Sequence, residues 1–307
     1  MRLEKKTTQV NLRLTPALKA AAEKAAGEER RSFTSLVENL LTAYLQTQPS
    51  VDDWHERGRA RFLRLVAEHQ AAASIATGAQ AKSFCIKAAP GERIEAHHLL
   101  RELQFIHGHS SAAFRHVPFF HPYTRRGLVP YFASDSELTR GRAEEILECF
   151  AAPPLVEGLE FWRVAPSGLA FDMRPYAEDR EAFRQHGLEP GKWFSPYFMT
   201  RDLEVFVHFA AALAAKIAPA AAVEFRCEWH GLMNRYAAAG EPDKFWPPAK
   251  FCRTDHRITR GEWPAAELSA SWAEIVSALG GPVVRLFDPT FAYAPEWIRS
   301  QSVKGTL

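Results

Sequence analysis

The sequence predicts an α+β protein in which a small N-terminal unit is joined to a larger mixed domain. Candidate strands and helices are mixed without a strict βαβ repeat, which is typical of α+β domains. All eight tryptophans and all twelve histidines lie beyond residue 50. A polar run that contains Pro49 separates the two parts and ends any preceding helix. We therefore expect residues 1–48 to form one domain, residues 49–80 a helical linker and residues 81–307 an α+β domain.

Composition and charge exclude several classes of protein. Of the 307 residues, 47% are hydrophobic and 24% charged, unlike disordered, collagen-like or coiled-coil chains. The net charge of +2 excludes a polybasic chain, but the first fifty residues carry +3 and the remainder −1. The four cysteines form no CxxC pair, which argues against a disulfide framework or a zinc ribbon. With neither a membrane-length apolar run nor a recognisable signal peptide, we expect a cytoplasmic protein without membrane contact.

Residues 7–14 alternate polar and apolar side chains with period two, which predicts a β-strand. Its apolar face holds Val10, Leu12 and Leu14, and its polar face holds Gln9, Asn11 and Arg13.

Two helices are expected after this strand. Thr15 and Pro16 are a helix N-cap and first helical residue, and Gly27 is the expected stop. The buried stripe of this helix is expected to be Leu18, Ala21, Ala22 and Ala25. Residues 32–45 predict a second helix with a broad apolar face. One strand and two helices bury too little surface to fold alone, so we expect a homodimer that pairs the two strands.

Two segments and their spacing resemble a known family. They are Gln9-Val10-Asn11-Leu12-Arg13, which precedes a helix with an initial proline, and Arg31-Ser32-Phe33-Thr34-Ser35. Together they resemble the ribbon-helix-helix DNA-binding proteins of the Arc, MetJ and CopG type over residues 5–46. Leu36 departs from the family, whose second helix carries an acidic residue there, so we do not expect the internal ion pair of Arc-like proteins.

The resemblance implies a two-stranded ribbon in the major groove of DNA. Its outward face would present Gln9, Asn11 and Arg13, because arginine pairs with guanine while asparagine and glutamine pair with adenine. Backbone amides at the start of the second helix would bind a phosphate and set the register. The expected phosphate-contacting residues are Lys5, Lys6, Arg31, Ser32, Phe33, Thr34 and Ser35.

Residues 52–80 predict one helix that opens with acidic residues and carries the larger domain as a stalk. Its four arginines, Arg57, Arg59, Arg61 and Arg64, are interpreted as a solvated face rather than phosphate contacts. Residues 158–176 predict a hairpin around Pro166-Ser167-Gly168.

Further along the chain, Thr200 is expected to cap a helix. The apolar stripe of that helix is Leu203, Phe206, Val207, Ala210, Leu213, Ala214 and Ile217. Residues 223–229 alternate as a strand, and residues 265–279 predict a last helix that stops at Gly280. Residues 177–290 also resemble a C-terminal region of bacterial proteins that carry a Schlafen-like AlbA DNA-binding domain, mainly in the strand Phe225-Arg226-Cys227-Glu228-Trp229-His230-Gly231-Leu232. That resemblance implies a recurring module without a known activity.

Six histidines cluster in one segment: His97, His98, His107, His109, His116 and His121. Within it, His98 and Glu102 are one helical turn apart, and the spacing of His107 and His109 suits Zn²⁺ or Ni²⁺. Because no HExxH or Cys/His finger pattern accompanies them, we interpret these as surface and core histidines and expect no metal and no cofactor.

Catalytic signatures are missing as well. The chain has no GxSxG, Walker-type, GxGxxG or kinase motif, so we expect no enzyme. The cysteines are interpreted as buried small side chains. The tryptophans Trp162, Trp193, Trp229 and Trp246 are interpreted as core rather than as the lining of a pocket.

The sequence therefore predicts a sequence-specific DNA-binding transcriptional regulator, a repressor, that binds a double-stranded operator as a homodimer or a dimer of dimers. Its C-terminal domain would sense an unidentified small-molecule or protein effector, or oligomerise. Two alternatives stay open. One is a DNA-tethered enzyme or defence effector with a metal-dependent site near the histidines, and the other is a plasmid partition or antitoxin component.

Overall fold

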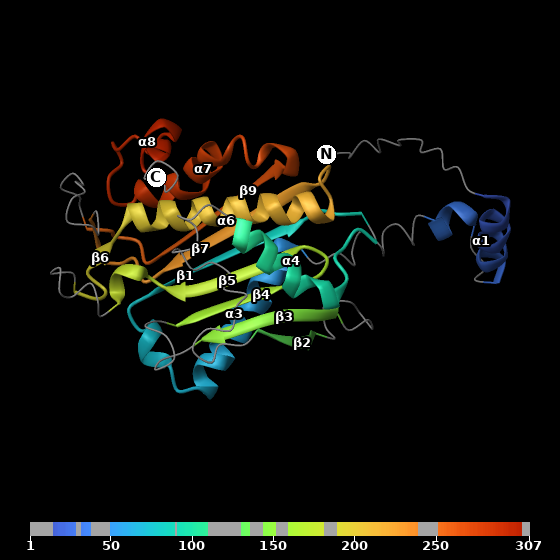
Figure 1. Cartoon of the computed structure of the whole chain (residues 1–307), viewed down its shortest axis with the longest axis horizontal. Helices are drawn as coiled ribbons and strands as arrows, with labels where there is room; N and C mark the ends of the chain where they lie inside the picture. The colour runs from blue at the N-terminus through green and yellow to red at the C-terminus, as the bar shows by residue number, and fades with distance from the viewer. Residues whose placement is uncertain are drawn as a thin grey trace, which may run out of the picture. The chain divides into compact units, whose positions relative to one another are not determined.

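A computed structural model of the chain describes residues 15–28, 32–37, 50–89, 91–109, 130–135, 144–151, 159–180, 189–238 and 251–302. It divides into two compact units, Met1–Gln48 and Pro49–Leu307. The mixed α+β class predicted from the sequence is confirmed (Figure 1). Among the described residues, none of the helices combines the length and the apolar character that crossing a membrane requires.

The described part of the N-terminal unit contains two helix starts. α1 (Pro16–Glu28) begins after Thr15, whose Oγ1 accepts a hydrogen bond from the Leu18 backbone N–H at 3.4 Å. Helical residues 33–37 begin after Ser32, whose Oγ accepts one from the Ser35 backbone N–H at 3.1 Å. Such side chains satisfy amides that have no partner within the helix. α1 runs one residue past its expected stop, a difference within the range over which helix ends fray.

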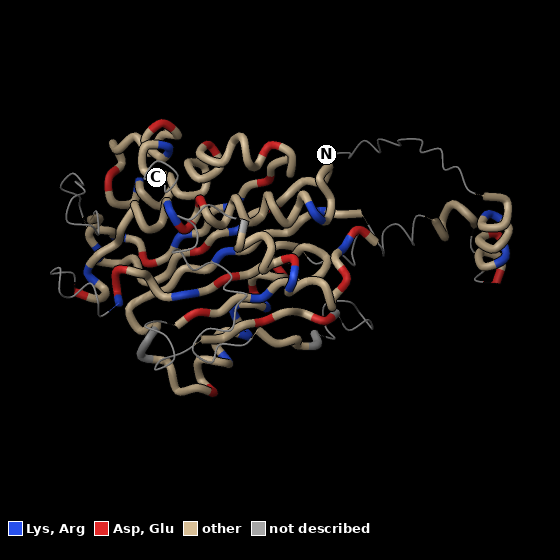
Figure 2. The backbone as a smooth tube through the Cα atoms, in the orientation of Figure 1, with Lys and Arg blue, Asp and Glu red and all other residues tan. Residues whose placement is uncertain are grey.

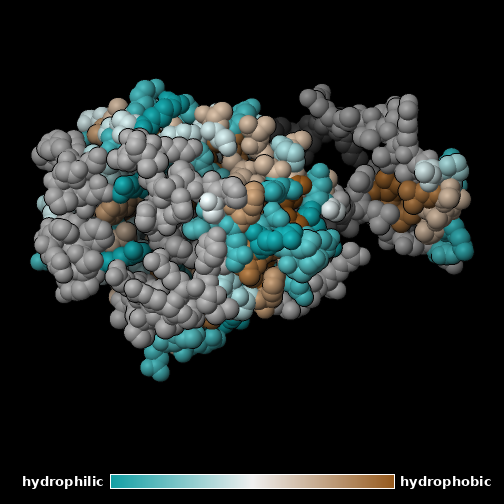
Figure 3. Space-filling view, in the orientation of Figure 1, coloured by the Kyte–Doolittle hydropathy of each residue, from teal (hydrophilic) through white to brown (hydrophobic). Residues whose placement is uncertain are grey.

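The predicted apolar stripe of α1 is largely uncovered within one chain. Leu18 is 56% exposed, Ala21 is exposed, and Ala22 and Ala25 are half-buried. Figure 3 shows brown, hydrophobic residues at the surface where Figure 1 labels α1. The expectation of a buried stripe applies to a dimer, so the exposure of these side chains in one chain leaves it a prediction.

The C-terminal unit is built on an antiparallel sheet, seven-stranded within the described residues, in the order β2-β3-β4-β5-β1-β7-β9. In that order the strands are Tyr131–Asp135, Glu144–Ala151, Glu160–Val164, Leu169–Pro175, Ala79–Ile86, Ala222–His230 and His256–Pro264. β4 and β5 form the predicted hairpin, and Gly168 at its turn has a φ of +90°, which favours glycine. A separate parallel pair joins β6 (Trp193–Phe194) to β8 (Tyr236–Ala237).

Helices cover both faces of this sheet (Figure 1). α3 (Val51–Glu68) packs on one face, and α4 (Ala96–His109), α6 (Pro196–Ile217) and α7 (Trp272–Val284) lie on the other. The short helix α8 (Pro295–Ser300) packs against α7. Single 3₁₀ turns occur at Ala72–Ile75, Ala177–Asp179 and Ala265–Glu267.

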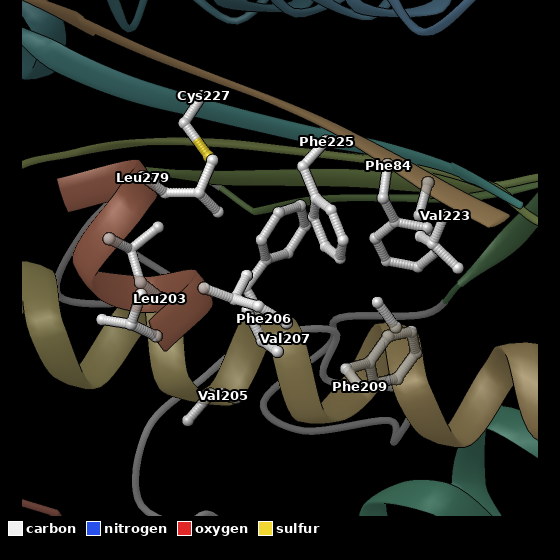
Figure 4. Packing of buried hydrophobic residues seen from close by; sticks show 14 of the residues in the cluster. Phe84, Leu203, Val205, Phe206, Val207, Phe209, Val223, Phe225, Cys227 and Leu279 are labelled. Carbon is white, nitrogen blue, oxygen red and sulfur yellow. The ribbon is translucent and has the colours of Figure 1, made fainter. Parts of the chain in front are cut away.

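The larger hydrophobic core lies between the sheet and α6. Figure 4 shows Phe84, Val223 and Phe225 pointing from the strands toward Phe206 and Phe209 of α6. The alternation predicted for residues 223–229 is confirmed: every second side chain of β7, from Val223 to Trp229, is fully buried on this face. The predicted stripe of α6 is also buried throughout.

The predicted helical linker and stalk over residues 49–80 are wrong. α3 ends at Glu68, and β1, a central strand, begins at Ala79. The helix stops because Gln70 adopts a left-handed φ of 54°, while the Ala71 N–H bonds to the Val66 carbonyl at 2.9 Å. This pattern is a Schellman-type helix end, in which glycine is the usual residue.

α3 also packs directly on the sheet. A Cβ added to Gly58 would lie 2.4 Å from the Phe171 ring of β5, so only glycine permits this close approach. Trp54 and Phe62 of α3 are fully buried against β4 and β5, within the same cluster of apolar side chains. Burying these two large rings holds α3 in the unit.

Two further helix starts differ from prediction. α6 begins at Pro196, and its cap is Ser195, whose Oγ accepts from the Phe198 N–H at 3.3 Å. Thr200 instead lies inside the helix and donates to the Pro196 carbonyl at 2.6 Å. α7 begins at Trp272 rather than residue 265 and continues through Gly280. A Cβ on Gly280 would lie 2.9 Å from Met199 of α6, so this glycine serves close packing and not helix termination.

Candidate functional site

The residues expected to read DNA bases, Gln9, Asn11 and Arg13, lie outside the described residues. The same holds for Lys5, Lys6 and Arg31 and for the whole predicted strand at residues 7–14.

The remaining expected phosphate contacts are described and stand at the start of the second helical run. Ser32 and Thr34 are exposed, and Phe33 and Ser35 are half-buried. Leu36, which departs from the family pattern, is buried as an apolar side chain within the N-terminal unit.

The most concentrated polar chemistry among the described residues lies beneath α3. His55 of α3 contacts Ser83 Oγ of β1 through Nδ1, and Glu228 Oε2 of β7 through Nε2, both at 2.8 Å. All three side chains are buried. Because an ionised carboxylate only accepts, His55 Nε2 carries the proton, and its Nδ1 accepts from the Ser83 hydroxyl.

Two more imidazoles meet the other oxygen of the Glu228 carboxylate. His256 Nε2 donates to Glu228 Oε1 at 2.8 Å, and His230 Nε2 lies 2.7 Å from the same atom. The two rings are stacked, with centroids 4.4 Å apart and planes at 11°. The strand register causes this geometry. His230 and His256 are directly opposite on β7 and β9, and Glu228 precedes His230 by two residues on the same face.

Arg226 and two acidic residues of α3 extend this network. The Arg226 guanidinium contacts Asp52 at 2.9 Å, Glu56 at 2.5 Å and Glu228 Oε2 at 3.2 Å. Arg260 of β9 also contacts Asp52, at 3.0 Å. The first two turns of α3 are thereby tied to β7 and β9 by charged hydrogen bonds.

The charges within the network follow from its geometry. Burial disfavours ionisation of Glu228, but the imidazoles of His230 and His55 beside it outweigh burial and hold the carboxyl pKa well below its usual range. Burial lowers the pKa of His55 and outweighs the contrary effect of Glu228. Glu228 is therefore an anion and His55 a neutral imidazole at neutral pH.

A second group of buried charges lies on the opposite face, beneath α6. Lys82 of β1 contacts Asp172 of β5 and Asp202 of α6, both at 3.4 Å. Arg174 forms two hydrogen bonds to Asp172, at 3.0 and 3.1 Å. Gln80 donates to Asp202 at 2.5 Å. Two cations and two anions thus compensate one another, and Figure 2 shows such blue and red positions interspersed along the central strands.

A third buried group joins the loops at one end of the sheet. Arg235 donates to both carboxylate oxygens of Asp179 and to the backbone carbonyls of Thr77, Trp193 and Gly231. Nearby, Glu178 accepts from the Ser195 N–H at 2.7 Å. Burial raises the pKa of the Glu178 carboxyl to about 7, although Arg235 opposes the shift.

The histidines singled out from the sequence are dispersed among other contacts. On α4, the imidazole rings of His97 and His98 pack together with their centroids 3.9 Å apart, and Glu102 Oε2 lies 3.4 Å from Lys216 Nζ. His107 is half-buried on α4, and the side chain of His109 lies outside the described residues, as do His116 and His121. Within the described part of the chain, ligand-type atoms gather in sets of three or more only at Glu228, His230 and His256, all within 4.8 Å of one another.

The structure agrees with the interpretation of the cysteines and with only part of those of the tryptophans and the α3 arginines. All four cysteines are buried with free thiols, and burial raises the pKa of Cys85, Cys149 and Cys227 to about 12. Trp162 and Trp229 belong to the core, whereas Trp193 is half-buried and Trp246 lies outside the described residues. Of the α3 arginines, Arg61 turns to the sheet and donates to Glu148 at 3.3 Å, while Arg64 is exposed.

Sequence reasoning missed the site around Glu228. Its one local signal is the alternation Glu228-x-His230, which places both side chains on one face of a strand. His256 and His55 reach the same carboxylate from distant parts of the chain. Comparisons with models of protein families, with curated proteins and with solved structures find no match to this chain.

Proposed function

We propose that this protein is a sequence-specific DNA-binding regulator whose N-terminal unit binds an operator as a dimer. The observation that carries the proposal is the order of three elements: an alternating segment at residues 7–14, then helix starts capped by Thr15 and by Ser32. Their order and spacing resemble the ribbon-helix-helix family. In that arrangement Gln9, Asn11 and Arg13 contact base edges in the major groove.

The exposed stripe of α1 supports a dimer. Leu18 and Ala21 are uncovered, and Ala22 and Ala25 are only half-buried within one chain. A second copy of the same unit would cover this stripe and would also give the predicted strand its partner. Within the described part of the unit, Ala26 and Leu36 are the buried hydrophobic side chains. A unit of about fifty residues buries little surface by itself, which favours a dimer.

Charge supports DNA as the ligand. The first fifty residues carry +3, whereas the rest of the chain carries −1. Basic side chains beside the ribbon would neutralise phosphates and release counterions, so affinity would fall as salt rises. The C-terminal unit, with its separate core, would then serve for sensing or oligomerisation rather than for DNA contact.

The test is a binding-site selection with the full-length protein at two salt concentrations, followed by affinity measurements on the selected site. We expect Arg13→Ala to weaken binding to that site by about tenfold to a hundredfold and to relax the preference at one base pair. Lys24→Ala is the matched control, because it removes one positive charge from an exposed position on α1. It should leave base preference unchanged. Unaltered operator discrimination in Arg13→Ala would contradict the proposal.

A further inference from the structure

Three side chains at the end of β7 and β9 have the donor set of a transition-metal site. Glu228 offers a carboxylate oxygen, and His230 and His256 each offer Nε2. Glu228 is buried, whereas the His256 side chain is 42% exposed, so solvent reaches one side of the group. Two imidazoles and one carboxylate with an open side are the donors that Zn²⁺ and Fe²⁺ take in many proteins.

The hydrogen bonding of this group is incomplete. His230 Nε2 is buried and lies 2.7 Å from Glu228 Oε1, but this contact does not have the geometry of a well-formed hydrogen bond. A buried nitrogen whose hydrogen bond is poorly formed is costly. An ion between His230 Nε2 and Glu228 Oε1 would accept the nitrogen lone pair and remove that cost.

The opposite side of Glu228 is already held in place. Glu228 Oε2 accepts from His55 at 2.8 Å and contacts Arg226 at 3.2 Å, so Oε1 is left to face the two histidines. Hydrogen bonds of this kind orient metal-binding carboxylates. Ser83, through His55, fixes the carboxylate further.

From this geometry we infer that Glu228, His230 and His256 bind one divalent transition-metal ion, with Zn²⁺ as the first candidate. Tetrahedral Zn²⁺ needs its donor atoms roughly 3.3 Å apart, given bonds of about 2.0 to 2.1 Å. The present separations from Glu228 Oε1 are 2.7 and 2.8 Å, so the imidazoles must move outward by about half an ångström. His256 can do so, because its half-exposed side chain lies on β9, the last strand in the sheet order.

The test uses full-length protein stripped with a chelator and dialysed, then titrated with Zn²⁺ by calorimetry and with Co²⁺ by visible absorption. Wild-type protein should bind one ion per chain, and His256→Ala and His230→Ala should each weaken binding by more than about tenfold. His256→Gln keeps a hydrogen-bond donor for Glu228 but has no imidazole. It should lose the ion while its thermal unfolding without metal stays close to that of wild type.

Two matched controls separate this site from the other histidines. His69→Ala removes an exposed imidazole that packs on Phe150, and it should leave binding intact. His98→Ala addresses the cluster on α4 and should also leave binding intact. The inference is overturned if wild-type protein binds no ion, or if binding survives His256→Ala and His256→Gln. Loss of binding in His98→Ala alone would place the ion on α4 and likewise overturn it.

Discussion

The two faces of the seven-stranded sheet, as far as the chain is described, bury charge in different ways. Beneath α6, Lys82, Arg174, Asp172 and Asp202 neutralise one another inside a large apolar core. Beneath α3, the apolar cluster is smaller, and the network around Glu228 runs from the buried His55 out to the half-exposed His256. The charges beneath α6 are compensated by one another, whereas the network beneath α3 opens to solvent at His256, where a ligand can reach it.

The closed cluster should be the more sensitive to loss of a partner. Asp172→Ala would leave Lys82 and Arg174 without the carboxylate that they share, and such a deletion typically costs about 3 to 5 kcal/mol. Chemical denaturation of wild type and variant would measure the loss in free energy of unfolding.

An exposed ion pair provides the control for this prediction. Glu274→Ala removes the partner of Arg299 at the surface and should cost at most about 1 kcal/mol. Equal losses of unfolding free energy in the two variants would show that Asp172 does not compensate the buried cations. The proposed difference between the two faces of the sheet would then be wrong.

The packing of α3 on the sheet should depend on its buried apolar side chains. Phe62→Ala removes a fully buried ring that packs near Phe161, and we expect a loss of about 3 kcal/mol. The neighbouring Leu63 is exposed on the same helix, so Leu63→Ala should change stability by less than about 0.5 kcal/mol. Two indistinguishable denaturation curves would mean that α3 does not pack on the sheet in solution.

The sequence is informative about this fold where the structural cause is local. Thr15 caps a helix through its own hydroxyl, the turn at Gly168 needs a positive φ, and the alternation of β7 reflects one buried face. Each of these depends on a few consecutive residues, so a pattern can report it. The stripe of α6 is a pattern of the same kind.

Two features could not be predicted, because their causes are distant or unusual. α3 ends at Glu68, and Gln70 just beyond it adopts a left-handed conformation that glycine usually marks, so the helix end carries no recognisable sequence signal. The site at Glu228 depends on the pairing of His230 with His256. The register between two strands that are distant in sequence cannot be predicted from the residues of either strand alone. The histidines that are close in sequence form no such group among the described residues.

Two buried glutamates, Glu228 and Glu178, should make stability depend on pH in opposite directions. Glu228, beside imidazoles, has a lowered pKa, whereas burial of Glu178 raises its carboxyl pKa from 4.5 to about 7. A raised pKa means that the folded state holds the proton more tightly than the unfolded state. The contribution of Glu178 to stability is therefore full below pH 4.5 and is lost as pH rises toward 7. Between pH 5 and 7 the loss should be roughly 2 kcal/mol.

Glu178→Gln should remove this pH dependence while keeping an oxygen that accepts from the Ser195 N–H. We expect the difference in unfolding free energy between variant and wild type to shift in favour of the variant by roughly 2 kcal/mol as pH rises from 5 to 7. Denaturation at pH 5, 6, 7 and 8 would measure it. Taking the difference between the two proteins cancels the titration of Glu228, which acts in the opposite direction because its pKa is lowered. Parallel profiles would mean that burial does not raise the pKa of Glu178 in the folded protein.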